Sequence, residues 1–290
     1  MNQDPILAIA LPVTLFCIMF GMGTALTPNH FRELLRQPRA VLTGMVAQML
    51  LLPLLAWLLL SLFELPAELF VGFMILALAP GGTTSNAFSY LAGGNLALSI
   101  ALTAIVSLLV PLTIPLLAAP LIESRLGVEA AIALPFAPTL GKLVAVGLLP
   151  VLLGMGLRHL RPDFCRRHEK AFTRLPLLML LAVIVGIVAG AWERMPGFLA
   201  LTGLPALTLA TAALFVGYGF ARLVREDRRN ARTIAIETAI QNGGTAIFVT
   251  GTLLQQPAMT VAPVMYGILM LLPVFAWLTL LRLRPAGALA

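Results

Sequence analysis

Long apolar segments constrain this chain more than any other feature of its sequence. Blocks of about 20 predominantly apolar residues, the length that crosses a hydrocarbon core ~30 Å thick, recur along its 290 residues. The chain is 60% hydrophobic and only 11% charged, whereas roughly a quarter of the residues in a soluble domain are charged. These observations predict an all-α integral membrane protein whose helices contact the lipid bilayer.

Hydropathy and helix-breaking residues divide the chain into about nine transmembrane helices. We expect them at residues 5–26, 39–62, 67–92, 95–119, 136–158, 172–191, 198–222, 231–255 and 259–282. Residues 1–4 lack the basic segment that opens a signal peptide, so the first apolar block is expected to be a retained span.

The distribution of charge predicts the orientation of these helices. The formal net charge is +7, and 16 of the 19 Lys and Arg lie at 32–39, 158–174, 222–232 and 282–284. The intervening connections carry acidic residues instead, namely Glu64, Glu68, Glu123, Glu129 and Glu193. Because basic residues concentrate in cytoplasmic loops, the N-terminus is expected outside and the C-terminus in the cytoplasm. This alternation favours membrane orientation over a nucleic-acid surface, and no nucleic acid is expected as a partner.

Two of the expected spans contain residues that interrupt a helix. The third contains Ala79-Pro80-Gly81-Gly82-Thr83-Thr84-Ser85-Asn86, and the eighth contains Glu237-Thr238-Ala239-Ile240-Gln241-Asn242-Gly243-Gly244-Thr245. Proline removes a backbone donor, and paired glycines weaken a helix. Unwound backbone at membrane depth is stable only where it is buried in protein or lines a cavity. The sequence therefore predicts two broken helices with a site beside them.

The positions of the breaks predict an inverted-topology repeat. Each break lies in the third span of a group of four, and the two groups begin on opposite sides of the membrane. The first half of the repeat is expected at 1–135, a connecting fifth span at 136–168 and the second half at 169–290. Inverted repeats with interrupted helices are typical of secondary transporters, which bind substrate near the bilayer midplane.

Glu237 is the acidic residue expected deepest within a span. An ionised carboxylate there costs several kcal/mol unless it is paired, protonated or bound to a cation. Gln241 follows four residues later, so both polar side chains share one helical face. A hard cation such as Na+ would satisfy their oxygens. The alternative is that Glu237 is a protonated or hydrogen-bonded residue that only packs helices together.

Other polar residues are expected near the breaks. Ser85 and Asn86 belong to the first break, and Ser99 and Thr103 are spaced by four in the following span. Their oxygens are suited to a cation, although Ser and Thr in membrane helices often bond to a carbonyl of their own helix. Gln48, in the middle of the second span, is either a ligand or a bridge between two helices. Spacing alone does not separate these alternatives.

Two short motifs and the cysteines point to no further chemistry. Gly21-Met22-Gly23 and Gly154-Met155-Gly156 are interpreted as sites of close helix packing, since they lack the strand-to-helix setting of a phosphate loop. Cys17 and Cys165 are far apart in the sequence, and the His, Cys and Asp residues show no metal-ligand spacing.

At these residues the chain resembles the bile acid:sodium symporter family, and in particular its bacterial-type members. The resemblance is carried by Ile18-Met19-Phe20-Gly21-Met22-Gly23, by Pro80-Gly81-Gly82-Thr83-Thr84-Ser85-Asn86, by Gly94-Asn95-Leu96-Ala97-Leu98-Ser99 and by residues 237–243. It extends over nearly the whole chain. Bacterial-type members often have ten spans, so with nine expected here the first helix of the family is expected to be absent.

The resemblance implies a panel domain of spans 1, 5 and 6 and a core domain of spans 2–4 and 7–9, in which the broken helices cross. It also implies two Na+ sites. The first would use Ser85, Asn86, Ser99, Thr103 and Glu237. The second would use Gln48, Glu237 and Gln241 with the backbone carbonyls of Thr238 and Ile240. Thr83 and Asn242 would contact the substrate.

The function expected from these features is sodium-coupled symport of a small organic anion by alternating access, with Na+ as the coupling ion. A rival keeps the fold but couples transport to a proton on Glu237, or makes the chain an auxin-efflux-like carrier. A membrane enzyme would need a repeated acidic motif, a catalytic Ser/His pair or a His within a span, and the sequence has none of them. A receptor or structural membrane protein leaves the paired breaks unexplained.

The sequence does not determine the substrate or the oligomeric state. Bile acids, keto acids and pantoate-like molecules are all compatible substrates. Short loops and the lack of a transit peptide favour a bacterial inner (plasma) membrane.

Overall fold

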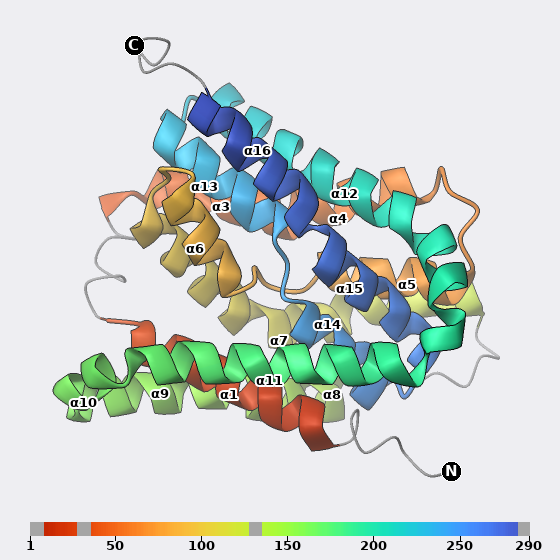
Figure 1. The fold of residues 1–290 in the computed structure, drawn as a ribbon, viewed down its shortest axis with the longest axis horizontal. Helices are drawn as coiled ribbons and strands as arrows, with labels where there is room; N and C mark the ends of the chain where they lie inside the picture. Colours follow the sequence, from red (N-terminus) through yellow and green to blue (C-terminus); the bar gives the residue numbers. More distant parts are fainter. Residues whose placement is uncertain (1–8, 28–35, 128–134, 284–290) are drawn as a thin grey trace.

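The computed structural model describes residues 9–27, 36–127 and 135–283, and within them the secondary structure is helical apart from one isolated bridge (Figure 1). Six helices in this part of the chain are long and apolar enough to cross a membrane: Pro38–Leu60, Leu96–Leu126, Phe136–Leu160, Glu169–Gly190, Trp192–Leu223 and Pro257–Leu283. Shorter apolar helices span Leu11–Ala25, Ala67–Ala77 and Gly243–Leu253. The prediction of an all-α integral membrane protein is confirmed. Arg32, Glu129 and Arg284, which contributed to the predicted orientation, lie outside the described residues.

One layer of the fold consists of helices that lie side by side along one edge of the molecule (Figure 1). They are α1 (Leu11–Ala25), α8 (Phe136–Leu143), η4 (Val144–Leu148), α9 (Leu149–Leu160), α10 (Pro162–Arg167) and α11 (Glu169–Gly190). Glycine permits their close approach: a Cβ on Gly21 would lie 2.2 Å from the carbonyl oxygen of Phe172, and one on Gly23 equally close to that of Val151. The first Gly-Met-Gly motif is thus confirmed as a packing site. In the second, Gly154 packs against α1 but Gly156 has no neighbour within 4 Å.

The remaining helices form the second, thicker layer (Figure 1). They are α3 (Pro38–Val46), η2 (Ala47–Leu51), α4 (Leu52–Leu60), α5 (Ala67–Ala77), α6 (Thr84–Leu91), α7 (Leu96–Leu126), η5 (Trp192–Arg194), α12 (Met195–Leu223), α13 (Arg228–Ala239), α14 (Gly243–Ile247), η6 (Phe248–Leu253), α15 (Pro257–Leu269) and α16 (Leu271–Leu283). The two interrupted spans are therefore α5 with α6, and α13 with α14 and η6. Both breaks fall within the predicted motifs.

Helix α7 is longer than the sequence predicted. It continues to Leu126, seven residues past the expected end, and contains Pro111, Pro115 and Pro120. Each proline removes one backbone hydrogen bond, but the bonds on either side remain, and no solvent at membrane depth competes for the backbone. Proline therefore fails to end this helix.

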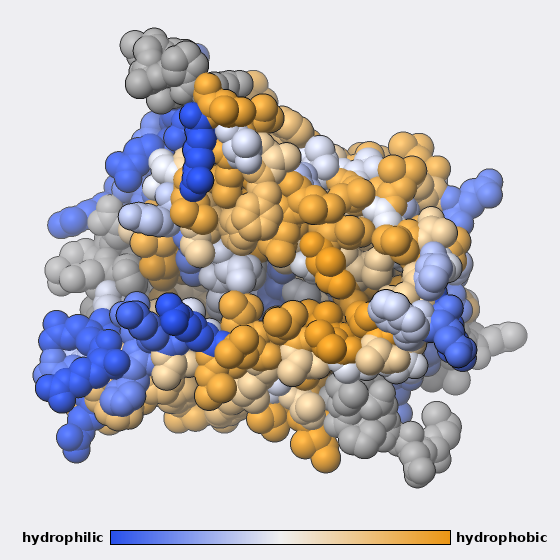
Figure 2. All heavy atoms as spheres, in the orientation of Figure 1, coloured by the Kyte–Doolittle hydropathy of each residue, from blue (hydrophilic) through white to orange (hydrophobic). Residues whose placement is uncertain are grey.

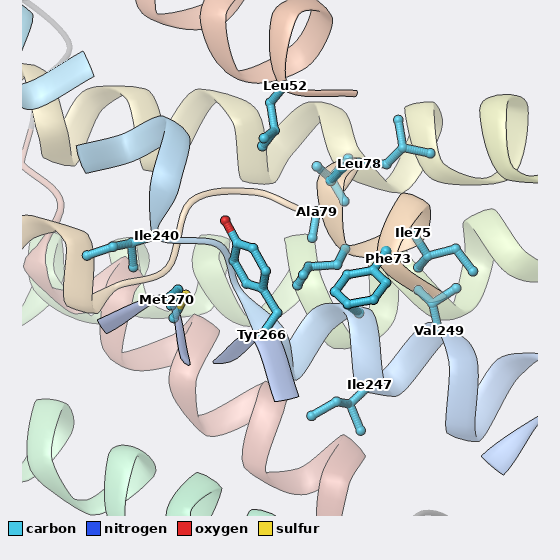
Figure 3. Packing of buried hydrophobic residues seen from close by; sticks show 14 of the residues in the cluster. Leu52, Phe73, Ile75, Leu78, Ala79, Ile240, Ile247, Val249, Tyr266 and Met270 are labelled. Atoms are coloured by element: carbon cyan, nitrogen blue, oxygen red, sulfur yellow. The ribbon is translucent and has the colours of Figure 1, made fainter. Parts of the chain in front are cut away.

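The hydrophobic core surrounds the two breaks (Figure 3). Phe73 and Ile75 of α5 and Val249 of η6 are buried there, and Tyr266 of α15 is the largest fully buried side chain of the described residues. In Figure 3 the Tyr266 hydroxyl reaches toward the extended segments that carry Ala79 and Ile240. The breaks are thus enclosed by protein, as unwound backbone in a membrane requires.

The outer surface of the described chain is suited to lipid. Figure 2 shows apolar residues across the middle of the molecule, with hydrophilic residues gathered at its left and right ends. Large apolar side chains are exposed along α11, including Leu175, Leu178 and Val185. A soluble monomer rarely exposes a continuous apolar patch of this extent, so this surface is the one that faces the bilayer.

Candidate functional site

The two interrupted spans cross at their breaks and hydrogen-bond to each other. The backbone N–H of Gly82 donates to the carbonyl of Ile240 (3.0 Å), and that of Asn242 donates to the carbonyl of Pro80 (2.9 Å). Gly81 and Gln241 thereby form an antiparallel bridge. Backbone groups that lose their helical partners at one break are satisfied by the other, which is how both breaks are stable at this depth.

Glycine is required at the crossing because the site residues approach it so closely. A Cβ on Gly81 would lie 2.5 Å from Glu237 Oε2 and 2.8 Å from Gln48 Nε2. The backbone of the first break therefore runs directly against the carboxylate carried by α13.

The Glu237 carboxylate is buried and receives hydroxyl donors from two other helices. Its side chain is 1% exposed. Ser85 of α6 donates to Oε1, Thr103 of α7 donates to Oε2 (2.9 Å), and Ser99 of α7 also donates to Oε1. Of the two alternatives left open for Ser99 and Thr103, the structure shows hydroxyls that bond to Glu237 of another helix. No ion pair to Glu237 occurs within the described residues.

Asn86 and Ser89 extend this first cluster of oxygens. Asn86 Oδ1 lies 2.8 Å from Ser99 Oγ, and Ser89 Oγ lies 3.2 Å from the same atom. Because a hydroxyl has a single proton to donate, Ser99 cannot satisfy both Glu237 and Asn86. The donors around the carboxylate are all neutral hydroxyls, so the negative charge of Glu237 has no positive partner in the described part of the chain, and a cation would supply one.

A second cluster lies on the other side of Glu237. Gln48, in the π-helical turn η2, donates from Nε2 to the Glu237 carbonyl (3.1 Å), and Gln241 donates from Nε2 to that carbonyl (3.1 Å) and to the Thr238 carbonyl (2.9 Å). The amide oxygens of both Gln48 and Gln241 are buried without a hydrogen-bond partner in the described part of the chain. Gln48 thus bridges two helices through its nitrogen while its oxygen stays unpaired. Buried acceptors without a hydrogen-bond partner are rare in proteins. Each one either binds a ligand or lowers the stability of the folded state.

The remaining predicted residues lie around the crossing. The carbonyl of Ile240 accepts from Gly82 and that of Thr238 accepts from Gln241. Asn242 is buried and caps α14, its Oδ1 accepting from the backbone N–H of Thr245 (3.1 Å). Thr83 is half-buried at the residue before α6. All eleven predicted site residues therefore lie on the two breaks or on the helices that contact them.

A polar network at one end of the second layer fixes the helices that carry these residues. Asn95 caps α7 through Oδ1 and donates from Nδ2 to Asn230 Oδ1 of α13 (2.9 Å) and to Gln37 Oε1 (3.2 Å). Its backbone N–H also donates to Thr233 Oγ1 (2.8 Å). A Cβ on Gly94 would lie 2.5 Å from Thr233 Oγ1. This Gly-Asn pair sets the register of Ser99 and Thr103 against Glu237.

Sequence reasoning missed Ser89 and Tyr266. The Tyr266 hydroxyl donates to the carbonyl of Ala239 (2.9 Å), a carbonyl that loses its helical donor because α13 ends there. A tyrosine inside an apolar span needs a partner for its hydroxyl, which was the available signal. The sequence contained no comparable signal for Ser89, because a serine four residues after Ser85 is an ordinary occurrence in a helix.

Comparison with known proteins identifies the family. The model of the Sodium Bile acid symporter family matches residues 12–195. The chain is 36% identical over 241 residues to the Uncharacterized sodium-dependent transporter YocS of Bacillus subtilis (strain 168), covering 80% of this chain and 71% of that protein. The chain belongs to the sodium bile acid symporter family.

Two more distant relatives are longer than this chain. The P3 protein of Bos taurus is 31% identical over 247 residues, 83% of this chain and 50% of that protein. The Probable sodium/metabolite cotransporter BASS1, chloroplastic, of Arabidopsis thaliana is 31% identical over 241 residues, 79% of this chain and 56% of that protein. The chain thus spans about half the length of these two relatives. The relatives named for an activity are named as transporters or cotransporters, in agreement with the predicted transporter and against an enzyme.

Proposed function

We propose that this chain is a secondary active transporter that couples the entry of Na+ to symport of a small organic anion by alternating access. The observation that carries the proposal is the buried Glu237 carboxylate at the crossing of two broken helices, flanked by two unpaired amide oxygens. A buried carboxylate without a basic partner is energetically unfavourable unless it binds a proton or a cation. Carboxylate, amide, hydroxyl and carbonyl oxygens together form the donor set that hard cations bind.

The proposed ion sites share Glu237. The first consists of Ser85, Asn86, Ser99, Thr103 and Glu237, where only neutral hydroxyls bond to the carboxylate and its negative charge has no positive partner among the described residues. The second consists of Gln48, Glu237 and Gln241 with the carbonyls of Thr238 and Ile240, and here the unpaired amide oxygens support an ion. Because Glu237 belongs to both sites, its substitution should weaken both.

The proposed architecture has nine crossings in an inverted repeat, with halves at 1–135 and 169–290 joined by a connector at 136–168. The layer of α1, α8–α9 and α11 corresponds to the panel, and the thicker layer with the crossing corresponds to the core. The basic segments set the N-terminus outside and the C-terminus inside, in the inner (plasma) membrane of a bacterium.

In the proposed mechanism Na+ binding orders the crossing, and the broken helix ends then present donors to the anion. Thr83 and Asn242, at the edges of the two breaks, are the proposed substrate contacts. Rocking of the core against the panel exposes the site to each side in turn. The ion gradient supplies the work, since one charge crossing 100 mV releases ~2.3 kcal/mol.

Melting temperature against NaCl concentration tests the proposal, with KCl holding the ionic strength constant in detergent. An ion that binds only the folded state stabilises it by RT ln(1 + [L]/Kd), so the midpoint should rise and saturate as Na+ replaces K+. Glu237→Gln should abolish this rise.

Thr250→Val is the matched control for this substitution. Thr250 is buried in the same span, but its hydroxyl bonds to the Ala246 carbonyl of its own helix (2.9 Å), so the variant should respond to Na+ like the wild type. A flat wild-type response over the millimolar range would refute sodium coupling. In that case pH-dependent binding that Glu237→Gln removes would point to the proton-coupled rival.

A further inference from the structure

Basic residues gather at one end of the layer that contains α11, where α9, α10 and α11 meet (Figure 1). Figure 2 shows hydrophilic surface there, at the lower left, directly beside apolar surface. Residues 158–174 carry six Lys and Arg against two acidic residues, a net charge of +4 with His neutral. The six residues, which we call the basic cluster, are Arg158, Arg161, Arg166, Arg167, Lys170 and Arg174.

The protein neutralises little of this charge. In the described part of the chain only Arg166 of the basic cluster has an ion pair, with Asp163, and the other five side chains make no hydrogen bond or ion pair there. Arginines of the thicker layer differ, because Arg39, Arg222 and Arg232 each donate to a backbone carbonyl. Most cations of the basic cluster are therefore available to an anion from outside the chain.

Helix stability does not account for the positions of Lys170 and Arg174. They are spaced by four residues in α11, so two like charges lie one turn apart on the same face, an arrangement that destabilises a helix. Lys170 also lies in the first turn of α11, the end at which the helix dipole disfavours a cation. Both positions become favourable if an anion binds beside them.

The basic cluster lies at the depth of the lipid headgroups. Helix α11 has 22 residues and is therefore ~33 Å long, close to the ~30 Å thickness of a hydrocarbon core. Its first turn is thus at one membrane interface. Of the six long apolar helices in the described chain, α11 is also the least buried, so its exposed face meets lipid.

One face of α11 joins the cations to the lipid-facing surface. Lys170, Arg174 and Leu178 follow one another at intervals of four residues and so share a face, and Arg174 is ~6 Å from Leu178 along the helix axis. Leu178 is exposed, and exposed Leu181 and Val185 continue the apolar surface along the helix. A molecule on this face meets cations at one end and apolar side chains along the rest, which matches a phosphate carried on acyl chains.

We propose that the basic cluster binds the headgroup phosphate of an anionic phospholipid. Lys170 and Arg174 are the main contacts, and the acyl chains lie along Leu178, Leu181 and Val185. Arginine and lysine are the usual protein partners of phosphate. A zwitterionic lipid has the same phosphate but adds an ammonium group that the cluster repels, so the site selects lipids of net negative charge. This lipid site does not depend on sodium coupling.

Native mass spectrometry of the whole chain in detergent tests the proposal. Phosphatidylglycerol and phosphatidylcholine with identical acyl chains are added at equal concentration, and the wild type should bind phosphatidylglycerol at least fivefold more tightly. A Lys or Arg at a membrane surface contributes about fivefold to the affinity for anionic lipid. Lys170→Gln combined with Arg174→Gln should therefore weaken phosphatidylglycerol binding about 5- to 30-fold and leave phosphatidylcholine binding nearly unchanged. The charge-preserving pair Lys170→Arg and Arg174→Lys should retain the preference.

The matched control removes the same charge elsewhere. Arg228 and Arg229 are exposed at the start of α13 in the thicker layer, and Arg228→Gln combined with Arg229→Gln should keep the wild-type preference. Inorganic phosphate at millimolar concentration should not displace the lipid, because it has no acyl chains to contact α11.

Four results would overturn the proposal. The first is equal binding of the two lipids to the wild type, and the second is an undiminished preference in the Lys170 and Arg174 glutamine variant. The third is an equal loss in the Arg228 and Arg229 variant, which would make the effect one of net charge. The fourth is displacement of phosphatidylglycerol by inorganic phosphate, which would assign the cluster to a free anion.

Discussion

Gly81→Ala perturbs the crossing of the broken helices without removing any ion-binding group. A Cβ at this position would lie 2.5 Å from Glu237 Oε2 and 2.8 Å from Gln48 Nε2, whereas ordinary contacts begin at 3.4 Å. The Gly81 backbone does not have a positive φ, so the effect of alanine is steric. Neither neighbour can retreat easily, because hydroxyls hold the carboxylate and Gln48 is bonded to the Glu237 carbonyl.

The size of the effect on Na+ binding follows from that overlap. Overpacking a close-fitting site costs ~1–3 kcal/mol. The ion-bound state bears this strain, since ion ligands are held to within about 0.2 Å. The Kd for Na+ should therefore rise about 5- to 150-fold. At a Na+ concentration about ten times the wild-type Kd, stabilisation per site should fall from ~1.4 kcal/mol to below ~0.7 kcal/mol.

The assay is the difference in melting temperature between NaCl and KCl at equal ionic strength. One site at tenfold saturation should raise the wild-type midpoint by about 3–5 °C, and Gly81→Ala should lose at least half of that rise. Gly267→Ala is the control, because a Cβ there would have no neighbour within 4 Å. An undiminished Na+ response in Gly81→Ala, or an equal loss in Gly267→Ala, would refute the reasoning.

Three further predictions concern other parts of the structure. Gln48→Met removes a buried oxygen that lacks a partner and the Nε2 donor to the Glu237 carbonyl, which keeps Gln241 Nε2 as a second donor; the melting temperature in KCl should fall modestly while the Na+ response is largely lost, and an unchanged Na+ response would refute the role of Gln48 as an ion ligand. Tyr266→Phe leaves the Ala239 carbonyl without its donor and should cost ~1–3 kcal/mol in denaturant unfolding with either salt; an unchanged unfolding midpoint would mean that this bond stabilises nothing. Gly23→Ala should lower the melting temperature because its Cβ would meet a backbone carbonyl at 2.2 Å. Gly156→Ala, which has open space, should be neutral or slightly stabilising, and equal effects of the two would contradict the assigned helix packing.

The sequence predicted which segments are helices and where two of them break, because hydropathy and the breakers Pro and Gly act over a few residues. In the structure α7 ends at Leu126, later than predicted, because proline interrupts a membrane helix less readily than a helix in water. It also divided the last apolar block into α15 and α16, which meet at Met270. Local patterns gave element type reliably and element length less so.

The candidate site was predictable as a set of residues but not as an arrangement. A four-residue spacing places Ser99 and Thr103 on one face of a helix, yet it does not say which neighbour that face meets. The sequence left bonding to carbonyls of their own helix open as the alternative, and only the packing of α7 against α13 brings them to Glu237, more than 130 residues away. Ser107 shows the same limit, since its spacing continues the series but its buried hydroxyl has no hydrogen-bond partner among the described residues.

By itself, then, the sequence determined the membrane class, the two helix breaks and the polar residues around them. Composition decides whether a segment prefers lipid to water, and proline and glycine decide where its backbone unwinds. Tertiary structure alone decided that the breaks hydrogen-bond to each other, that three hydroxyls converge on one carboxylate, and that the oxygens of Gln48 and Gln241 are left unpaired. Those contacts join residues distant in the chain, and they depend on how whole helices pack, which no local pattern encodes.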